Sequence, residues 1–245
     1  MTTEIQTIRS EIEGLISFLL EKELALSTNP PIIRIRGTEE FLTWSGAPER
    51  ISDTFGQQFA SIPEYYTCLD SNYYHVLLYD GGLLQFGYLF EDGIMTRHRL
   101  LYYPCPVQIP SDIVALAGPG EDFKLIFEGL AHEQLDSLKN DLENGTLAKS
   151  DSVIRARTPI RFDYSSVPAK SKTDHSLSHL HFNDSDCRWP VYGPLSVGSF
   201  VRFVFKSFYR SNWNEHESLR NWRPRHYTRT ILNDEKADLF IESIA

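Results

Sequence analysis

The stretch YYHVLLYDGGLLQFGYLFEDGIMTRHRLLYY, residues 73–103, decides the fold class of this chain. Its three apolar segments are separated by Gly81-Gly82 and by Glu91-Asp92-Gly93, and short glycine turns of this kind join antiparallel strands. Pro104 ends the third segment, because proline has no amide hydrogen for a sheet hydrogen bond. The sequence therefore predicts a β-meander over residues 73–103.

Helical patterns flank the meander on both sides. In residues 4–26, isoleucine and leucine recur at helical spacing until prolines stop the helix at residues 30–31. Such an N-terminal helix packs its apolar face against the core or against a partner. Ser196 or Ser199 is expected to cap a helix over residues 196–209. Further helices are expected over residues 111–117, 131–143 and 233–244, with irregular structure over 210–230.

A second group of strands is expected over residues 153–192. Apolar and polar side chains alternate with period two over residues 153–164, and residues 178–182 and 188–192 have the composition of short strands. Only the polar stretch 165–176 resembles a linker, and it joins two strands that are expected to pair. We therefore expect one α+β domain over residues 1–245, in which an antiparallel β-meander sheet is packed by N-terminal and C-terminal helices.

Charge is divided unevenly along the chain. The net charge is −9, but residues 1–150 carry 10 basic and 22 acidic side chains, whereas residues 151–245 carry 14 and 11. A generally acidic protein binds nucleic acid poorly unless basic residues gather locally. Any anionic ligand is therefore expected to bind the second part of the chain.

The cysteines, the N-terminal sequence and the lengths of the apolar runs predict a cytoplasmic protein. The spacing of Cys68, Cys105 and Cys187 fits neither a metal knuckle nor a redox motif, as is common in a reducing compartment. The N-terminus shows no basic region followed by an apolar stretch, and no apolar run reaches about 18 residues. We therefore expect no signal peptide and no membrane partner.

Polar residues on two expected strands form the first candidate site. In residues 178–182 (SHLHF), both histidines lie on one side of the strand. If the strand over 153–164 pairs with this one, Arg161 and Asp163 share the same face as the two histidines. Arginine can hold a phosphate, aspartate can orient a histidine, and two imidazoles can serve as base and acid in cleaving a phosphoester beside a 2′-hydroxyl. The predicted catalytic residues are His179, His181, Asp163 and Arg161; the alternative is a structural face with hydrogen-bonded histidines and a cross-strand salt bridge.

The same histidines could instead bind a metal ion. His175, His179 and His181, together with Asp174, offer enough ligands for zinc or manganese. Histidine acid–base chemistry would require no cofactor, so a divalent metal is one alternative and sensitivity to a chelator distinguishes the two.

A basic and aromatic stretch near the C-terminus is the second candidate site. Residues 220–229 (RNWRPRHYTR) contain no acidic side chain, and such a mixture can follow phosphates and stack on unpaired bases. The alternative is a surface rim that balances the acidic first part. The residues predicted to bind nucleic acid are Arg220, Trp222, Arg223, Arg225, Tyr227 and Arg229.

Two further stretches contain basic or aromatic side chains. Arg97-His98-Arg99 on the meander could add to a phosphate-binding face, although solvated charge is the simpler interpretation. The aromatic residues 200–209 could line a pocket, but a buried helix or strand accounts for them as well. No phosphate-binding loop, dinucleotide fingerprint, nucleophile elbow or His-Glu-x-x-His motif is present.

Several segments together resemble a bacterial family, the domain of unknown function twenty-two ninety. They are residues 80–90 (DGGLLQFGYLF), 99–106 (RLLYYPCP), 178–182 (SHLHF) and the pattern Pro-Leu-Ser-x-x-x-Phe-Val-x-Phe from Pro194. The resemblance runs from the meander to about Tyr209 and implies no particular activity.

A shorter resemblance concerns the candidate site. Residues 161–164 (RFDY), followed by a polar loop and His-x-His, are similar to the central segment of the TumE-type toxins of bacterial toxin–antitoxin pairs, which are regarded as ribonucleases. The similarity points to Arg161, Asp163, His179 and His181, although Ser178 stands where those toxins have a further histidine.

Two functions follow from these observations. The first is a nuclease, RNA-directed, in a toxin–antitoxin or phage-defence system, with RNA and an antitoxin as partners. The second is a non-catalytic adaptor that binds another protein or nucleic acid in a bacterial defence operon, as the acidic first part and the N-terminal helix suggest. A small-molecule enzyme is a third reading.

Overall fold

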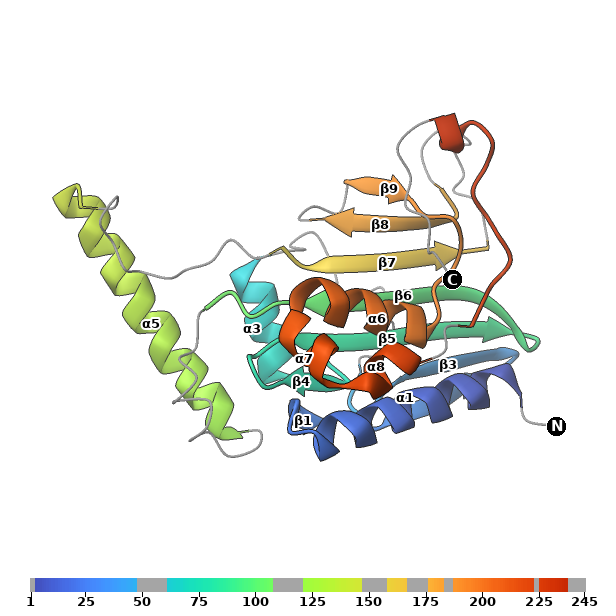
Figure 1. The fold of residues 1–245 in the computed structure, drawn as a ribbon, viewed down its shortest axis with the longest axis horizontal. Helices are drawn as coiled ribbons and strands as arrows, with labels where there is room; N and C mark the ends of the chain where they lie inside the picture. Colours follow the sequence, from blue (N-terminus) through green and yellow to red (C-terminus); the bar gives the residue numbers. More distant parts are fainter. Residues whose placement is uncertain are drawn as a thin grey trace.

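The computed structural model describes residues 3–47, 61–107, 121–146, 158–166, 176–182, 187–222 and 225–237 (Figure 1). The helices are α1 (Glu4–Glu21), α3 (Ile62–Asp70), α5 (Glu121–Asn144), α6 (Val197–Phe208), α7 (Arg210–Glu215) and α8 (Glu217–Asn221), with a 3-10 turn at Glu235–Ala237. The strands are β1 (Ala25–Thr28), β2 (Pro31–Arg36), β3 (Glu39–Trp44), β4 (Val76–Leu78), β5 (Leu83–Glu91), β6 (Ile94–Tyr103), β7 (Ile160–Ser165), β8 (Ser178–Phe182) and β9 (Arg188–Pro190).

All nine strands belong to one antiparallel sheet. Its main path runs β1-β4-β5-β6-β7-β8-β9, and β3 pairs with both β2 and the far end of β5. The meander predicted over residues 73–103 is the centre of this sheet, as β4, β5 and β6. The α+β class and the flanking helices are confirmed.

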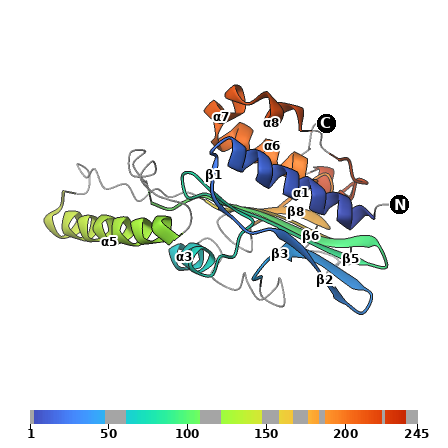
Figure 2. The ribbon, with the colours of Figure 1, turned by 90° about the horizontal axis from the view of Figure 1, so that it is seen from below.

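Helices cover the two faces of the sheet unequally. Figure 2 shows α1 and α6 on one face, with α7 and α8 beside them, and α3 on the other face. The apolar stripe of α1 is buried in the core, with Ile5, Ile8, Ile12, Leu15 and Leu19 at most 1% exposed. Of the two alternatives for the N-terminal helix, packing against the core is therefore correct.

The hydroxyl of Ser196 starts α6 by accepting a hydrogen bond from the backbone nitrogen of Ser199 at 3.1 Å. Phe200, Val201, Val204 and Phe205 of this helix are 0% exposed against the sheet, so the aromatic stretch is a core helix. The helix α5 projects from the sheet (Figure 1), and it is longer than the helix predicted over residues 131–143.

Two predictions from the sequence were wrong, the end of the first helix and the irregular structure over residues 210–230. The first helix ends at Glu21, because Glu23 adopts a left-handed conformation with φ 55° that ends the helix before β1. Residues 25–28 then pair with β4 instead of extending α1. Residues 210–230, expected to be irregular, contain α7 and α8.

Other predicted segments lie partly or wholly outside the described residues. The strand predicted over 153–164 is described from Ile160 onward, and the helix predicted over 111–117 is not described. In the last predicted helix, residues 233–244, only the turn Glu235–Ala237 is described, so the remainder of this helix stays a prediction. None of the described helices has both the length and the apolar character of a membrane-spanning segment.

Gly82 in the β4–β5 turn has no room for a side chain. A Cβ there would lie 2.5 Å from the Tyr209 hydroxyl and 3.2 Å from Oδ1 of Asp80. Gly82→Ala is therefore expected to lower the free energy of unfolding by about 1–3 kcal/mol, measured by urea denaturation. Gly14→Ala is the control, since nothing lies within 4 Å and α1 should gain up to about 1 kcal/mol. Equal stability of Gly82→Ala and wild type would show that Tyr209 moves aside without cost.

Candidate active site

Strand register brings the first set of predicted residues together. β7 pairs with β8, so that Arg161 lies opposite His181 and Asp163 lies opposite His179. On its other side, β7 pairs with β6, which places Arg99 opposite Asp163. Residues directly opposite one another share a face, so these five side chains occupy one face of the sheet. The pairing of the two strands, on which the candidate site depended, is thus confirmed.

This polar face is more buried than a half-exposed sheet surface. Arg161 is 5% exposed and His181 is 1% exposed, whereas the side chains of Asp163 and Arg99 are 15% and 23% exposed. His179 is half-buried. Among these five residues, His179, Arg99 and Asp163 are partly exposed, and Arg161 and His181 are buried.

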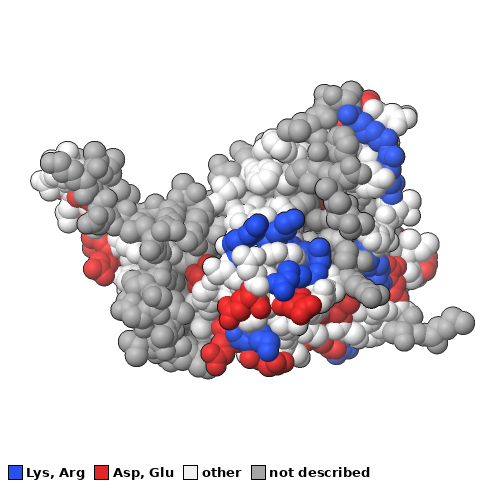
Figure 3. Space-filling view, in the orientation of Figure 1, with Lys and Arg blue, Asp and Glu red and all other residues white. Residues whose placement is uncertain are grey.

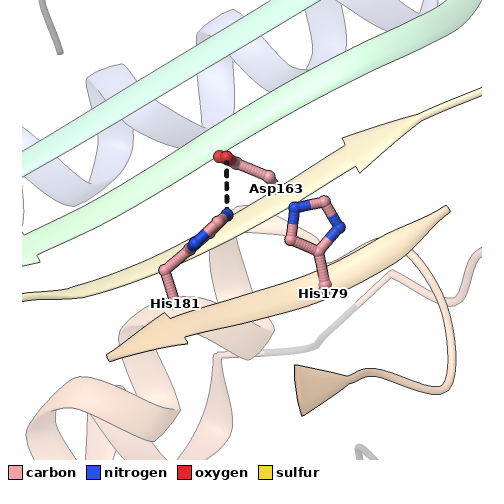
Figure 4. A group of neighbouring side chains, drawn as sticks. All are labelled: Asp163, His179 and His181. Carbon is pink, nitrogen blue, oxygen red and sulfur yellow. Dashed lines mark ion pairs between the residues drawn. The ribbon is translucent and has the colours of Figure 1, made fainter. Parts of the chain in front are cut away.

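Asp163 is the centre of the cluster. Its Oδ1 accepts a hydrogen bond from Nε of Arg99 at 3.2 Å, and its Oδ2 accepts one from Nε of Arg161 at 3.0 Å. Nε2 of His181 lies 3.4 Å from the same Oδ2, as the dashed line in Figure 4 marks. Two guanidinium groups and one imidazole therefore surround a single carboxylate.

The two histidines meet edge to face. Their ring centroids are 4.7 Å apart with an interplanar angle of 72° (Figure 4). Nδ1 of His179 lies 2.9 Å from the carbonyl oxygen of Ser176, and a carbonyl can only accept a hydrogen bond. Nδ1 of His179 therefore carries the proton, and the lone pair on Nε2 is available to accept another.

Burial and charge shift the pKa values of this cluster in opposite directions. Burial would raise the pKa of Asp163, but Arg99, His181 and Arg161 outweigh burial and hold that pKa well below its ordinary range. Burial lowers the pKa of His179 to about 4, although the charge of Asp163 opposes this shift. At neutral pH the site thus contains an ionised Asp163 and an uncharged His179.

A family model described as "Uncharacterized conserved protein (DUF2290)" matches residues 24–243. The chain belongs to the DUF2290 family. This match confirms the family resemblance seen in the sequence, whereas the resemblance to TumE-type toxins stays a prediction. Comparison with curated proteins and with solved structures finds no match.

The DUF2290 chain places a three-residue ligand set at this site. Ligand atoms of Asp163, His179 and His181 all lie within 4.8 Å of one another, while Asp174 and His175 lie outside the described residues. A divalent ion bound to Asp163 would, however, lie beside the guanidinium groups of Arg99 and Arg161. Like charges at such distances repel, so the described surroundings favour an anion over a metal ion.

The segment Arg97-His98-Arg99 divides between the two faces of the sheet. Arg97 and Arg99 lie on the face of the site, and Arg99 joins the cluster, which the alternation of β6 could have indicated. His98 lies on the helix side, where its Nε2 accepts a hydrogen bond from the backbone nitrogen of Leu195 at 3.0 Å. His98 is therefore a structural histidine.

Two buried histidines, His75 and His98, and the half-buried His179 should make stability depend on pH. Burial lowers the pKa of His75 to about 3 and those of His98 and His179 to about 4, against about 6.5 in an unfolded chain. As the pH falls below about 6.5, the unfolded chain binds protons that the folded chain does not. The free energy of unfolding is thus highest above pH 6.5 and decreases toward pH 4, by up to about 1.4 kcal/mol per pH unit for each histidine.

Urea unfolding at pH 7.5, 5.5 and 4.5 measures this loss. His132→Gln, at an exposed position of α5, should leave the pH dependence unchanged. Equal stability at pH 7.5 and 5.5 would contradict the prediction.

The second candidate site is largely occupied by contacts within the chain. Arg220 donates to the carbonyl oxygens of Trp213 and Asn214 at 2.9 and 2.6 Å, and Trp222 packs edge to face on Phe18. Arg225 pairs with Glu11 of α1 at 2.8 Å. The remaining residues are Tyr227, which packs against the core, Arg229, whose guanidinium lies 5.1 Å from the Tyr192 ring centroid, and Arg223, which is outside the described residues.

Proposed function

We propose that this DUF2290 protein is a nuclease that cleaves RNA without a metal ion, using the Asp163–His179–His181 face. The observation that supports the proposal most strongly is an uncharged, half-buried His179 beside a cluster in which Asp163 is bound by Arg99 and Arg161. A neutral imidazole next to cationic groups suits proton abstraction beside a phosphate.

His179 is the general base in this proposal. Its Nε2 takes the proton of the 2′-hydroxyl, and the resulting oxygen attacks the adjacent phosphorus, forming a 2′,3′-cyclic phosphate as the bond to the 5′-oxygen breaks. The protonated His179 then gives this proton to the departing 5′-oxygen. A bound phosphodiester adds negative charge beside the ring, which raises the pKa of His179 toward neutrality and makes it a stronger base.

The other residues have supporting roles. Arg99 is partly exposed, so it is assigned to the negative charge that develops on phosphate, with Arg188 opposite His181 on β9 as a further cation. Arg161 is too buried to be the phosphate ligand that the sequence suggested, and it positions Asp163. His181 is also buried, and its ring packs edge to face against that of His179. In this proposal it positions His179 and does not act as a second acid–base group on the substrate.

Cleavage of labelled single-stranded RNA by the purified protein tests the proposal. Cleavage is expected with and without a chelator, and a substrate with a single 2′-deoxynucleotide at the cleaved position should resist. Loss of cleavage in the chelator would instead support a metal site at Asp163, His179 and His181.

An inert wild-type protein would overturn the nuclease proposal and favour the non-catalytic adaptor. The toxin–antitoxin or phage-defence setting is part of the proposal and is supported by the local resemblance to TumE-type toxins. The apolar face of α1 is buried in this chain's own core and does not offer the adaptor a surface for a partner.

A further inference from the structure

Four aromatic side chains, two exposed and two partly buried, lie on the helix side of the sheet, opposite the candidate active site. α6 lies over β5 and β6, and β7, β8 and β9 extend beyond it (Figure 1). Phe203 and Phe208 come from α6, and Phe182 and Trp189 come from the outer strands. We call these four residues the aromatic surface. Phe208 and Trp189 are 45% and 39% exposed, which is unusual for such large apolar side chains.

The rings of the aromatic surface are held by edge-to-face contacts. Phe203 contacts Phe208 with ring centroids 6.1 Å apart and Phe162 of β7 at 5.4 Å. Phe182 contacts Trp189 with centroids 5.7 Å apart. These contacts fix the orientation of each ring while part of Phe208 and Trp189 remains open to solvent.

Cationic side chains border this surface. Lys206 lies one helical turn after Phe203, and Arg210 begins α7 two residues after Phe208. Both are exposed, and neither forms an ion pair with another described residue. Figure 3 shows a group of basic side chains over α6 and α7, with uncharged surface on one side of it and acidic side chains on the other. The apolar rings alone would fit many partners, but this local charge in an acidic protein favours a polyanion.

We infer that the aromatic surface binds single-stranded RNA, with bases stacked on Trp189 and Phe208 and phosphates near Lys206 and Arg210. Aromatic rings beside cations are the combination that recognises unpaired nucleotides without regard to sequence. The inference extends the proposed function, because Trp189 and Arg188 are neighbours on β9 and face opposite sides of the sheet. A strand that stacks on Trp189 thus needs to cross only this edge strand to reach Arg188 and His179.

Fluorescence anisotropy with a labelled 2′-O-methyl oligonucleotide measures binding without cleavage, since the 2′-hydroxyl nucleophile is blocked. Trp189→Ala and Phe208→Ala should each weaken binding about 5- to 150-fold, as expected for loss of one stacked base. Lys206→Gln with Arg210→Gln should reduce the dependence of binding on salt. Ile94→Ala, 69% exposed at the start of β6, is the matched control and should bind like wild type.

An abasic oligonucleotide of equal length separates stacking from charge, and it should bind wild type more weakly than the normal oligonucleotide binds Trp189→Ala, because it lacks the bases stacked on both rings. The inference is overturned if wild type does not bind the oligonucleotide, if the abasic form binds equally well, or if Trp189→Ala and Phe208→Ala bind like wild type. Binding with these losses but without cleavage of RNA would retain the inference and overturn the nuclease. If wild type cleaves RNA but Trp189→Ala and Phe208→Ala bind the oligonucleotide like wild type, the nuclease proposal would stand and the inference about the aromatic surface would be overturned.

Discussion

Replacing His179 by glutamine is expected to slow RNA cleavage about 10²- to 10⁴-fold, the usual contribution of a general base. The glutamine amide can still donate a hydrogen bond to the carbonyl oxygen of Ser176, which lies 2.9 Å from Nδ1 of His179. It cannot take a proton from a 2′-hydroxyl. Cleavage of labelled RNA under single-turnover conditions measures the rate of the chemical step in both proteins.

His132→Gln on the exposed surface of α5 is the control for this substitution and should cleave at the wild-type rate. The thermal midpoint of His179→Gln should stay close to that of wild type, because His179 lies on the polar face and not in the helix-side core. His181→Ala is a poorer test of catalysis, since a side chain that is 1% exposed leaves a cavity when removed. If His179→Gln cleaves as fast as wild type, His179 is not the base.

Asp163→Ala is expected to destabilise the protein by about 3–5 kcal/mol, because it leaves buried positive charge without its counterion. Both arginines lose the same carboxylate, whose oxygens lie 3.0 Å from Nε of Arg161 and 3.2 Å from Nε of Arg99. The side chain of Arg161 is only 7% exposed. Urea denaturation at pH 7 measures the free energy of unfolding. The free energy of unfolding of Asp163→Asn should lie between those of wild type and Asp163→Ala, because the amide oxygen can still accept a hydrogen bond but carries no charge.

Asp136→Ala on α5 is the matched control for the loss of an exposed carboxylate and should change stability by no more than about 0.5 kcal/mol. Such a difference between two aspartates would show that the cluster on β6, β7 and β8 contributes to folding whether or not it is catalytic. Unchanged stability of Asp163→Ala would mean that other groups compensate Arg161 and Arg99, and the carboxylate would then have no structural role.

The sequence by itself determined the local elements whose side-chain pattern repeats. Glycine turns and apolar segments defined the meander over residues 73–103, and helical spacing defined α1 but not the residue at which it ends. Period-two alternation correctly placed Arg161 with Asp163, and His179 with His181, on one side of their strands. These features depend on neighbours in the chain, so they can be read from residue types and spacing alone.

The tertiary structure alone decided what these side chains meet. Strand register brought Arg99 to Asp163, although 64 residues separate them in the sequence. Burial turned an apparently half-exposed face into a site where Arg161 supports a carboxylate and His179 remains uncharged. Long-range pairing likewise made residues 25–28 a strand and used Arg220 and Arg225 for contacts within the chain. Burial and charge at a position arise from residues distant in sequence, so local patterns could not determine them.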